Sequence, residues 1–135
     1  RFPDSRIDVT VPDELLIVPM DATLIEQVLI NLIENSIRHS DSPLPISLKV
    51  SSKKSGAVFT ISDQGKGIDP SRIPDIFDGK ANKVSSDSSR GLGIGLSICK
   101  SIILAHDGKI FAENNISGGA RFTFVLPMKG ENDYA

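Results

Sequence analysis

Asp63 and the glycines after it form a candidate ligand-binding turn. The segment Asp63-Gln-Gly-Lys-Gly67 follows the apolar run 57–61, which predicts a strand. A carboxylate at the end of a buried strand can accept a hydrogen bond from an exocyclic amine such as that of adenine. Glycines let the backbone approach a flat ligand closely. An ordinary turn initiated by an aspartate is the alternative interpretation.

A second glycine segment precedes a predicted helix. Gly91-Leu-Gly-Ile-Gly95 runs into an apolar helical pattern that continues to about Ala105. Unpaired N–H groups and the positive end of the helix dipole make such a helix start suitable for phosphates. Two other phosphate motifs are excluded, because no GxxxxGK[ST] sequence occurs and Leu96 stands where GxGxxG requires glycine.

Three polar residues lie at helical spacing in an otherwise apolar segment. Asn31, Asn35 and Arg38 share one face of a helix predicted from Asp21 or Thr23 to about His39, and Ile, Leu and Val fill the opposite face. Asn is a mediocre helix former, so this stripe needs an explanation. A solvated helix face is one explanation, and a wall of a binding site is the other.

Length and composition narrow the class of protein. With 135 residues and a net charge of −2, the chain suits one globular domain and gives no reason to expect nucleic-acid binding. No apolar run approaches the roughly 18 residues that span a bilayer. The single cysteine, Cys99, excludes an internal disulfide, and His39 and His106 lack the spacing of zinc or nucleophilic sites. The chain begins at Arg1 and not at Met, which favours a piece of a longer protein.

Strands and helices alternate without a strict βαβ repeat, which predicts an α+β fold. A polar segment without periodicity, 78–90, is expected to be a mobile loop, and Ser71 to Phe77 a short helix. The predicted strands are 7–11, 15–18, 46–50, 57–61, 109–113 and 121–126.

Taken in order, the polar stripe, Asp-x-Gly-x-Gly, the polar loop and Gly-x-Gly-x-Gly resemble the ATP-binding domain of sensor histidine kinases. Its Bergerat fold is shared with gyrase, Hsp90 and MutL ATPases. The resemblance runs from about Val18 to Pro127. It implies a two-layer sandwich, with a mixed, mostly antiparallel sheet covered on one face by about three helices. Residues 1–127 would form the domain, 78–90 its ATP lid and 128–135 a flexible tail. Segments 28–35, 76–78, 97–100 and 118–127 look like those of the KdpD potassium-sensing kinases.

The resemblance also implies residue roles. Asn35 would be the Mg²⁺ ligand, supported by Asn31, while Arg38 meets a phosphate, His39 lies near the nucleotide and Asp63 binds the adenine amine. The set implied to bind the nucleotide is Asn31, Asn35, Arg38, His39, Asp63, Gly65, Gly67, Ile68, Lys83, Arg90, Gly91, Leu92, Gly93 and Leu96.

The chain departs from the family pattern after Phe77. Lys80 and Asn82 stand where the family usually has a second aromatic residue and an arginine, and Lys80, Lys83 or Arg90 could supply charge instead. This departure puts lid order and contact with the γ-phosphate in doubt more than nucleotide binding.

In the family the phosphate acceptor is a histidine on a separate helical dimerisation domain, and neither histidine here stands in that context. The expected activity is therefore phosphoryl donation from Mg-ATP, with no catalytic residue certain in this chain. The implied partners are that helical domain, through which the parent dimerises, and a response regulator, with no nucleic acid or direct membrane contact. The domain would be cytoplasmic in a membrane-anchored parent. The alternatives are a stand-alone serine kinase of the anti-sigma-factor type and a nucleotide-binding interaction module without transfer activity.

Overall fold

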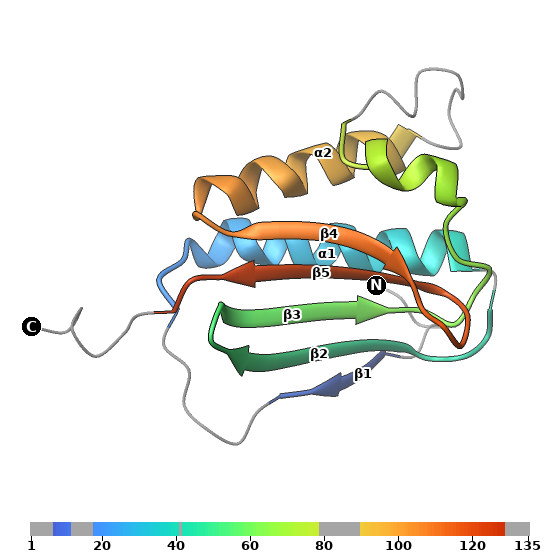
Figure 1. Cartoon of the computed structure of the whole chain (residues 1–135), viewed down its shortest axis with the longest axis horizontal. Helices are drawn as coiled ribbons and strands as arrows, with labels where there is room; N and C mark the ends of the chain where they lie inside the picture. Colours follow the sequence, from blue (N-terminus) through green and yellow to red (C-terminus); the bar gives the residue numbers. More distant parts are fainter. Residues whose placement is uncertain (1–6, 12–17, 41, 79–89, 129–135) are drawn as a thin grey trace, which may run out of the picture.

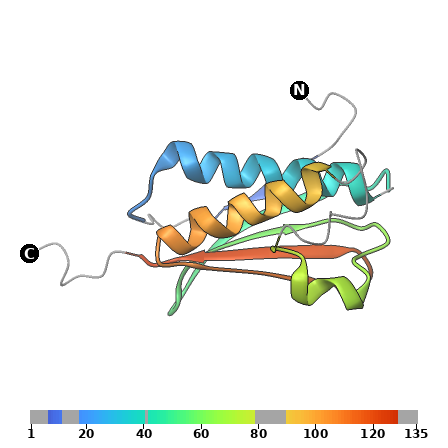
Figure 2. The same ribbon diagram turned by 90° about the horizontal axis from the view of Figure 1, so that it is seen from above.

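The computed structural model describes residues 7–11, 18–40, 42–78 and 90–128. Two α-helices lie across one face of a five-stranded sheet (Figures 1 and 2). The helices are α1 (Ala22–Ser40) and α2 (Arg90–Ala105), and a short 3₁₀ helix, η1 (Pro70–Asp75), is the third helical element. The strands are β1 (Ile7–Thr10), β2 (Ile46–Lys53), β3 (Gly56–Ser62), β4 (Lys109–Asn114) and β5 (Ala120–Leu126).

The strand order in the sheet is β1-β2-β3-β5-β4. β1 pairs with β2 in parallel, and the other three pairings are antiparallel. The predicted α+β class and the mixed, mostly antiparallel sheet are therefore confirmed. This order places the end of β3 next to the start of β5 in the middle of the sheet, where the Asp63 turn begins.

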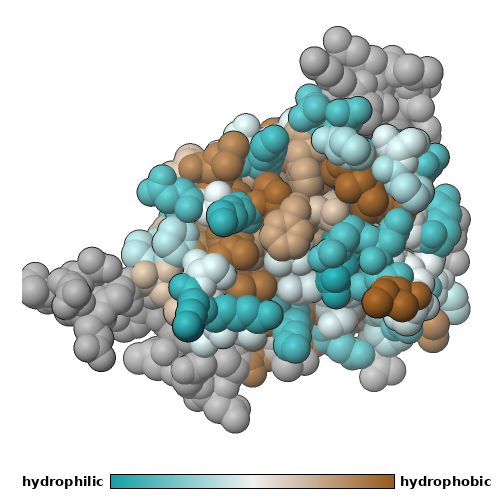
Figure 3. Space-filling model, viewed as in Figure 1, coloured by the Kyte–Doolittle hydropathy of each residue, from teal (hydrophilic) through white to brown (hydrophobic). Residues whose placement is uncertain are grey.

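The core lies between the two helices and the sheet. Alternate residues of β3 and β5 face the helices, and Phe59 stacks on Phe124 with ring centroids 4.6 Å apart. The buried apolar residues of the helices recur at the helical spacing that the sequence predicts. They are Ile25, Val28 and Leu32 from α1 and Leu96, Cys99, Ile102 and Ile103 from α2. The opposite face of the sheet is turned toward the viewer in Figure 3 and mixes hydrophilic with hydrophobic side chains.

The helix ends follow local rules with one difference from expectation. Asp21 is the residue that opens α1, because its Oδ1 accepts a hydrogen bond from the Leu24 N–H at 3.1 Å. The segment His106-Asp-Gly108 predicts that Gly108 ends α2 as the C-terminal glycine, but Asp107 occupies the left-handed position, with φ 61°. Gly108 is needed for space instead, since a Cβ there would collide with the Val125 carbonyl.

Several predictions fall outside the described residues. They are most of the strand 15–18, the lid residues 79–89 with Lys80 and Lys83, and the tail from residue 129. The sequence predicts a helix that follows the glycines, whereas α2 already begins at Arg90 and includes them. No helix among the described residues has the length and apolar character needed to cross a membrane.

Candidate functional site

Asn35 brings a polar side chain from α1 into the interior. The residue is only 9% exposed, although amides are usually found at the surface. Its Oδ1 is buried and has no hydrogen-bond partner among the described residues. Since a buried carbonyl oxygen without a partner costs free energy, this atom is suited to a ligand that supplies the missing interaction.

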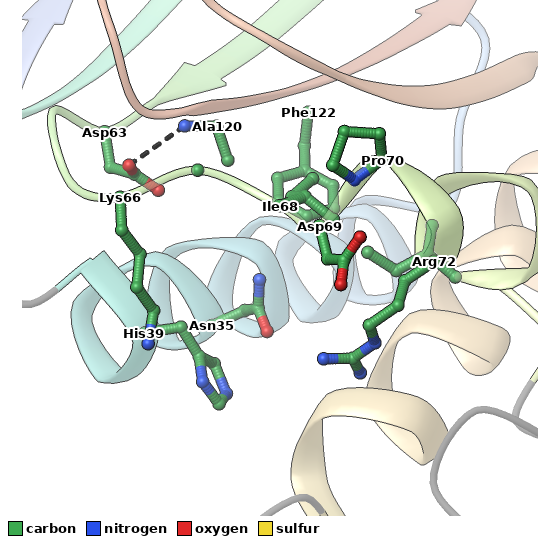
Figure 4. Close-up of a pocket in the computed structure, with 12 residues that line it drawn as sticks. Asn35, His39, Asp63, Lys66, Ile68, Asp69, Pro70, Arg72, Ala120 and Phe122 are labelled. Carbon is green, nitrogen blue, oxygen red and sulfur yellow. Dashed lines mark hydrogen bonds between the residues drawn. The ribbon is translucent and has the colours of Figure 1, made fainter.

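Asp63 lies where β3 ends and is 5% exposed. Its Oδ1 accepts hydrogen bonds from the backbone N–H groups of Gly65 and Ala120, both at 3.0 Å. Figure 4 shows this oxygen joined to Ala120 and the other carboxylate oxygen turned toward the pocket. One oxygen therefore fixes the carboxylate, and the other is left to accept a hydrogen bond from a ligand.

These two residues line one pocket of about 490 Å³, within the size range of small-molecule sites. Its walls are α1, the loop from Asp63 into η1, and the start of β5 (Figure 4). Its lining residues are Asn35, His39, Asp63, Lys66, Gly67, Ile68, Asp69, Pro70, Arg72, Ile76, Ala120 and Phe122. Ile68, Ile76 and Phe122 give the pocket an apolar part that suits a flat ring, and Asp63 offers an acceptor for an amine on that ring.

The structure thus brings together five of the predicted site residues: Asn35, His39, Asp63, Gly67 and Ile68. They come from α1 and the glycine turn, which are well separated in sequence. Because Asn35 is buried, a solvated helix face does not describe its position.

Other predicted residues do not line this pocket. Asn31 accepts a hydrogen bond from Gln27 Nε2 at 3.0 Å and packs against Gly95 of α2. Arg38 is exposed on the other side of the stripe. Leu96 is 1% exposed in the hydrophobic core. The three polar residues of the α1 stripe therefore lie in three environments: Asn35 in the pocket, Asn31 against α2 and Arg38 in solvent.

Gly65 and Gly67 have different structural roles. A Cβ at Gly65 would collide with the carbonyl of Ser40, so this glycine lets the turn pack against the end of α1. Gly67 has φ 82° and lines the pocket. Of the phosphate segment, Arg90, Gly91, Leu92 and Gly93 form the first turn of α2, where backbone N–H groups lack helical partners.

Lys66 and Arg72 line the pocket, and the sequence did not single them out. In the view of Figure 4 they lie on either side of Asn35. The only signal was their place in or near the glycine turn. Asp69 caps η1, and hydrogen bonds from the backbone and hydroxyl of Ser71, together with the nearby charge of Arg72, lower the pKa of its carboxyl. The pocket therefore has two cationic groups and a carboxylate that stays ionised at its rim.

Asn35 also fits a magnesium ion. Mg²⁺ is held by oxygen ligands, keeps several waters and takes few protein groups when it is bound with phosphates. The unpartnered amide oxygen of Asn35 is such a donor.

Comparison with known proteins defines the class. Residues 20–130 match the family of histidine kinase-, DNA gyrase B- and HSP90-like ATPases, and the chain belongs to this family. It is similar to the sensor protein KdpD of Clostridium acetobutylicum, with 48% identity over 95% of the chain. That region is 14% of KdpD, so the chain corresponds to a small part of the relative.

Solved structures agree with the class. The catalytic domain of the histidine kinase ThkA is 30% identical, with a TM-score of 0.75, and the match covers 92% of this chain and 78% of that domain. Full-length ShkA, solved in complex with AMPPNP, is 25% identical with a TM-score of 0.75, covering 91% of this chain and 25% of ShkA. The chain is thus a histidine kinase-type ATP-binding catalytic domain.

Proposed function

We propose that this domain binds Mg-ATP in the pocket beside α1 and donates the γ-phosphoryl group to a histidine on a separate helical dimerisation domain. The phosphoryl group would then pass to an aspartate of a response regulator. The main support is that the unpartnered Asn35 oxygen and the fixed Asp63 carboxylate line one pocket.

In this proposal each group has one task. Asp63 accepts a hydrogen bond from the adenine amine through the carboxylate oxygen that faces the pocket, while Gly67 and Ile68 form the wall beside the ring. Asn35 would hold Mg²⁺ through its amide oxygen, and Asn31, one turn earlier on α1, remains a predicted support for the waters of the ion. Bound Mg²⁺ would neutralise charge on the phosphates.

The phosphates would extend toward the first turn of α2, where the N–H groups of Gly91, Leu92 and Gly93 donate hydrogen bonds. Arg38, Arg90 and Lys83 remain predicted phosphate contacts, and His39 and Leu96 predicted nucleotide contacts. The acceptor histidine nitrogen attacks the γ-phosphorus in line, the bond to the β,γ-bridging oxygen breaks, and ADP leaves.

The parent protein is proposed to be a dimeric sensor kinase anchored in the cell membrane, with this domain in the cytoplasm. The similarity to KdpD supports this proposal and a role in potassium sensing.

A transfer assay tests the function. The domain is mixed with the helical domain of its parent and γ-labelled ATP. Acid-labile label on the histidine of the helical domain supports the proposal, and acid-stable label on a serine supports the serine kinase. The altered segment after Phe77 favours a second candidate, an interaction module without transfer, which predicts normal ATP binding and no label.

A further inference from the structure

Asn114 is the last residue of β4. Its side-chain amide forms hydrogen bonds with both the N–H group and the carbonyl group of the Ile68 main chain. Asn114 Oδ1 accepts a hydrogen bond from the Ile68 N–H at 2.7 Å, and Asn114 Nδ2 donates one to the Ile68 carbonyl at 2.8 Å. The two residues are 46 positions apart in sequence. A side-chain amide has a donor and an acceptor on adjacent atoms, so this pairing imitates the partner residue of a β-sheet.

The surrounding backbone is arranged around this contact. A Cβ at Gly67 would lie 2.7 Å from Asn114 Oδ1, so glycine at this position leaves room for the amide. At the other end of the turn, Asp63 N–H donates to the Ala120 carbonyl at 2.9 Å, and Asn115 Nδ2 lies 3.4 Å from the Asp63 carbonyl. The β4–β5 turn therefore holds both ends of the segment 63–68.

We propose that Asn114 is a positioning residue for the nucleotide, and this inference rests on the proposed function. Asn114 does not line the pocket, whereas Ile68, which it holds, does. Its two hydrogen bonds set the distance between the Ile68 wall and the Asp63 carboxylate, which together would enclose the adenine. Without them the segment 65–68 samples other positions, and the nucleotide must order it on binding.

Two substitutions of similar size separate the hydrogen bonds. Asn114→Asp keeps an acceptor for the Ile68 N–H but loses the donor, and Asn114→Leu loses both. Ser117→Ala is the matched control, because Ser117 is an exposed residue of the same turn. The hydrogen-exchange rate of the Ile68 amide, measured by NMR in the absence of nucleotide, reports how firmly the loop is held. Calorimetric titration with ATP and Mg²⁺ reports affinity.

For Asn114→Leu we expect the Ile68 amide to exchange about tenfold faster and the Kd for ATP to rise about tenfold, with a smaller rise for Asn114→Asp. Amides within β4 and β5 keep their protection, and Ser117→Ala behaves as the unsubstituted chain. Unchanged Ile68 exchange and ATP affinity in Asn114→Leu would overturn the inference. Protection lost equally throughout β4 and β5 would also overturn it, because it indicates a general role in the hairpin.

Failure of the proposed function has a different signature. If the unsubstituted chain binds no ATP, the proposed function is wrong, and the role of Asn114 in nucleotide binding is wrong with it. Faster Ile68 exchange in Asn114→Leu would still show that the amide holds the loop. If the unsubstituted chain binds ATP and Asn114→Leu binds it equally well, only the inference fails.

Discussion

The imidazole of His106 joins the end of α2 to the start of α1, because its Nε2 accepts a hydrogen bond from the Asp21 backbone N–H at 3.0 Å. Its Nδ1 lies 2.8 Å from the Ile102 carbonyl oxygen. A neutral ring with its proton on Nδ1 satisfies both contacts. Since Asp21 also caps α1, this single side chain connects the two helices of the layer at one end.

Replacing this ring tests its contribution to stability. His106→Ala removes both hydrogen bonds, so we expect the free energy of unfolding to fall by about 2 kcal/mol in urea titrations. His106 does not line the pocket, so ATP affinity should stay unchanged. The control Ile116→Ser alters a fully exposed residue and should change stability by less than about 0.5 kcal/mol. Equal stability of both variants would show that the contact contributes nothing.

Asn35→Ala tests the proposed metal ligand. We expect it to abolish Mg²⁺-dependent ATP binding, measured by calorimetry with and without Mg²⁺, while circular dichroism shows an intact fold. The neighbouring Ser36 is a matched control, because it is 1% exposed and its Oγ has no partner among the described residues. Ser36→Ala should keep ATP binding and raise the unfolding free energy by about 1 kcal/mol. Normal Mg-ATP binding by Asn35→Ala would refute the ligand assignment.

Asp63→Asn tests the adenine-binding role. Asn keeps an oxygen for the N–H groups of Gly65 and Ala120, so the turn is retained. An NH₂ group then replaces the carboxylate oxygen that faces the pocket, and two donors oppose each other when adenine binds. We expect the Kd for ATP to rise tenfold or more, and that for GTP to change much less, since guanine has an acceptor at this position. An equal loss for both nucleotides would contradict the role.

The thiol of Cys99 is expected to be inert in the folded domain. Burial raises its pKa to about 11, an effect that a hydrogen bond with Asn31 partly offsets. At pH 8 the thiolate fraction should be about a hundredfold lower than in the unfolded chain, and alkylation by iodoacetamide correspondingly slower. Because the folded pKa is the higher one, the contribution of Cys99 to the unfolding free energy should be constant below about pH 9 and fall as the pH rises from about 9 to 11. Rapid alkylation at pH 8 without unfolding would disprove the burial argument.

Local patterns were sufficient for most of the fold. The helical period of α1 and the apolar run of β3 predict these elements within about one residue of their observed bounds, whereas β2 extends three residues beyond its predicted end. Asp63 was also predictable, since a carboxylate followed by spaced glycines after a strand is a local signal. The ends of α2 were less predictable, because the C-terminal position went to Asp107 and glycine was required one residue later for space.

The sequence by itself determined which residues are apolar, where the chain turns and which side of α1 is polar. Only the tertiary structure decided what each polar residue of that side contacts: Asn35 lines the pocket, Asn31 packs against α2 and Arg38 is exposed. It also brought Lys66 and Arg72 to the pocket and paired Asn114 with Ile68 and His106 with Asp21. A sequence period specifies a face of an element, but its partner depends on strand order and helix packing, which join residues 46 and 85 positions apart.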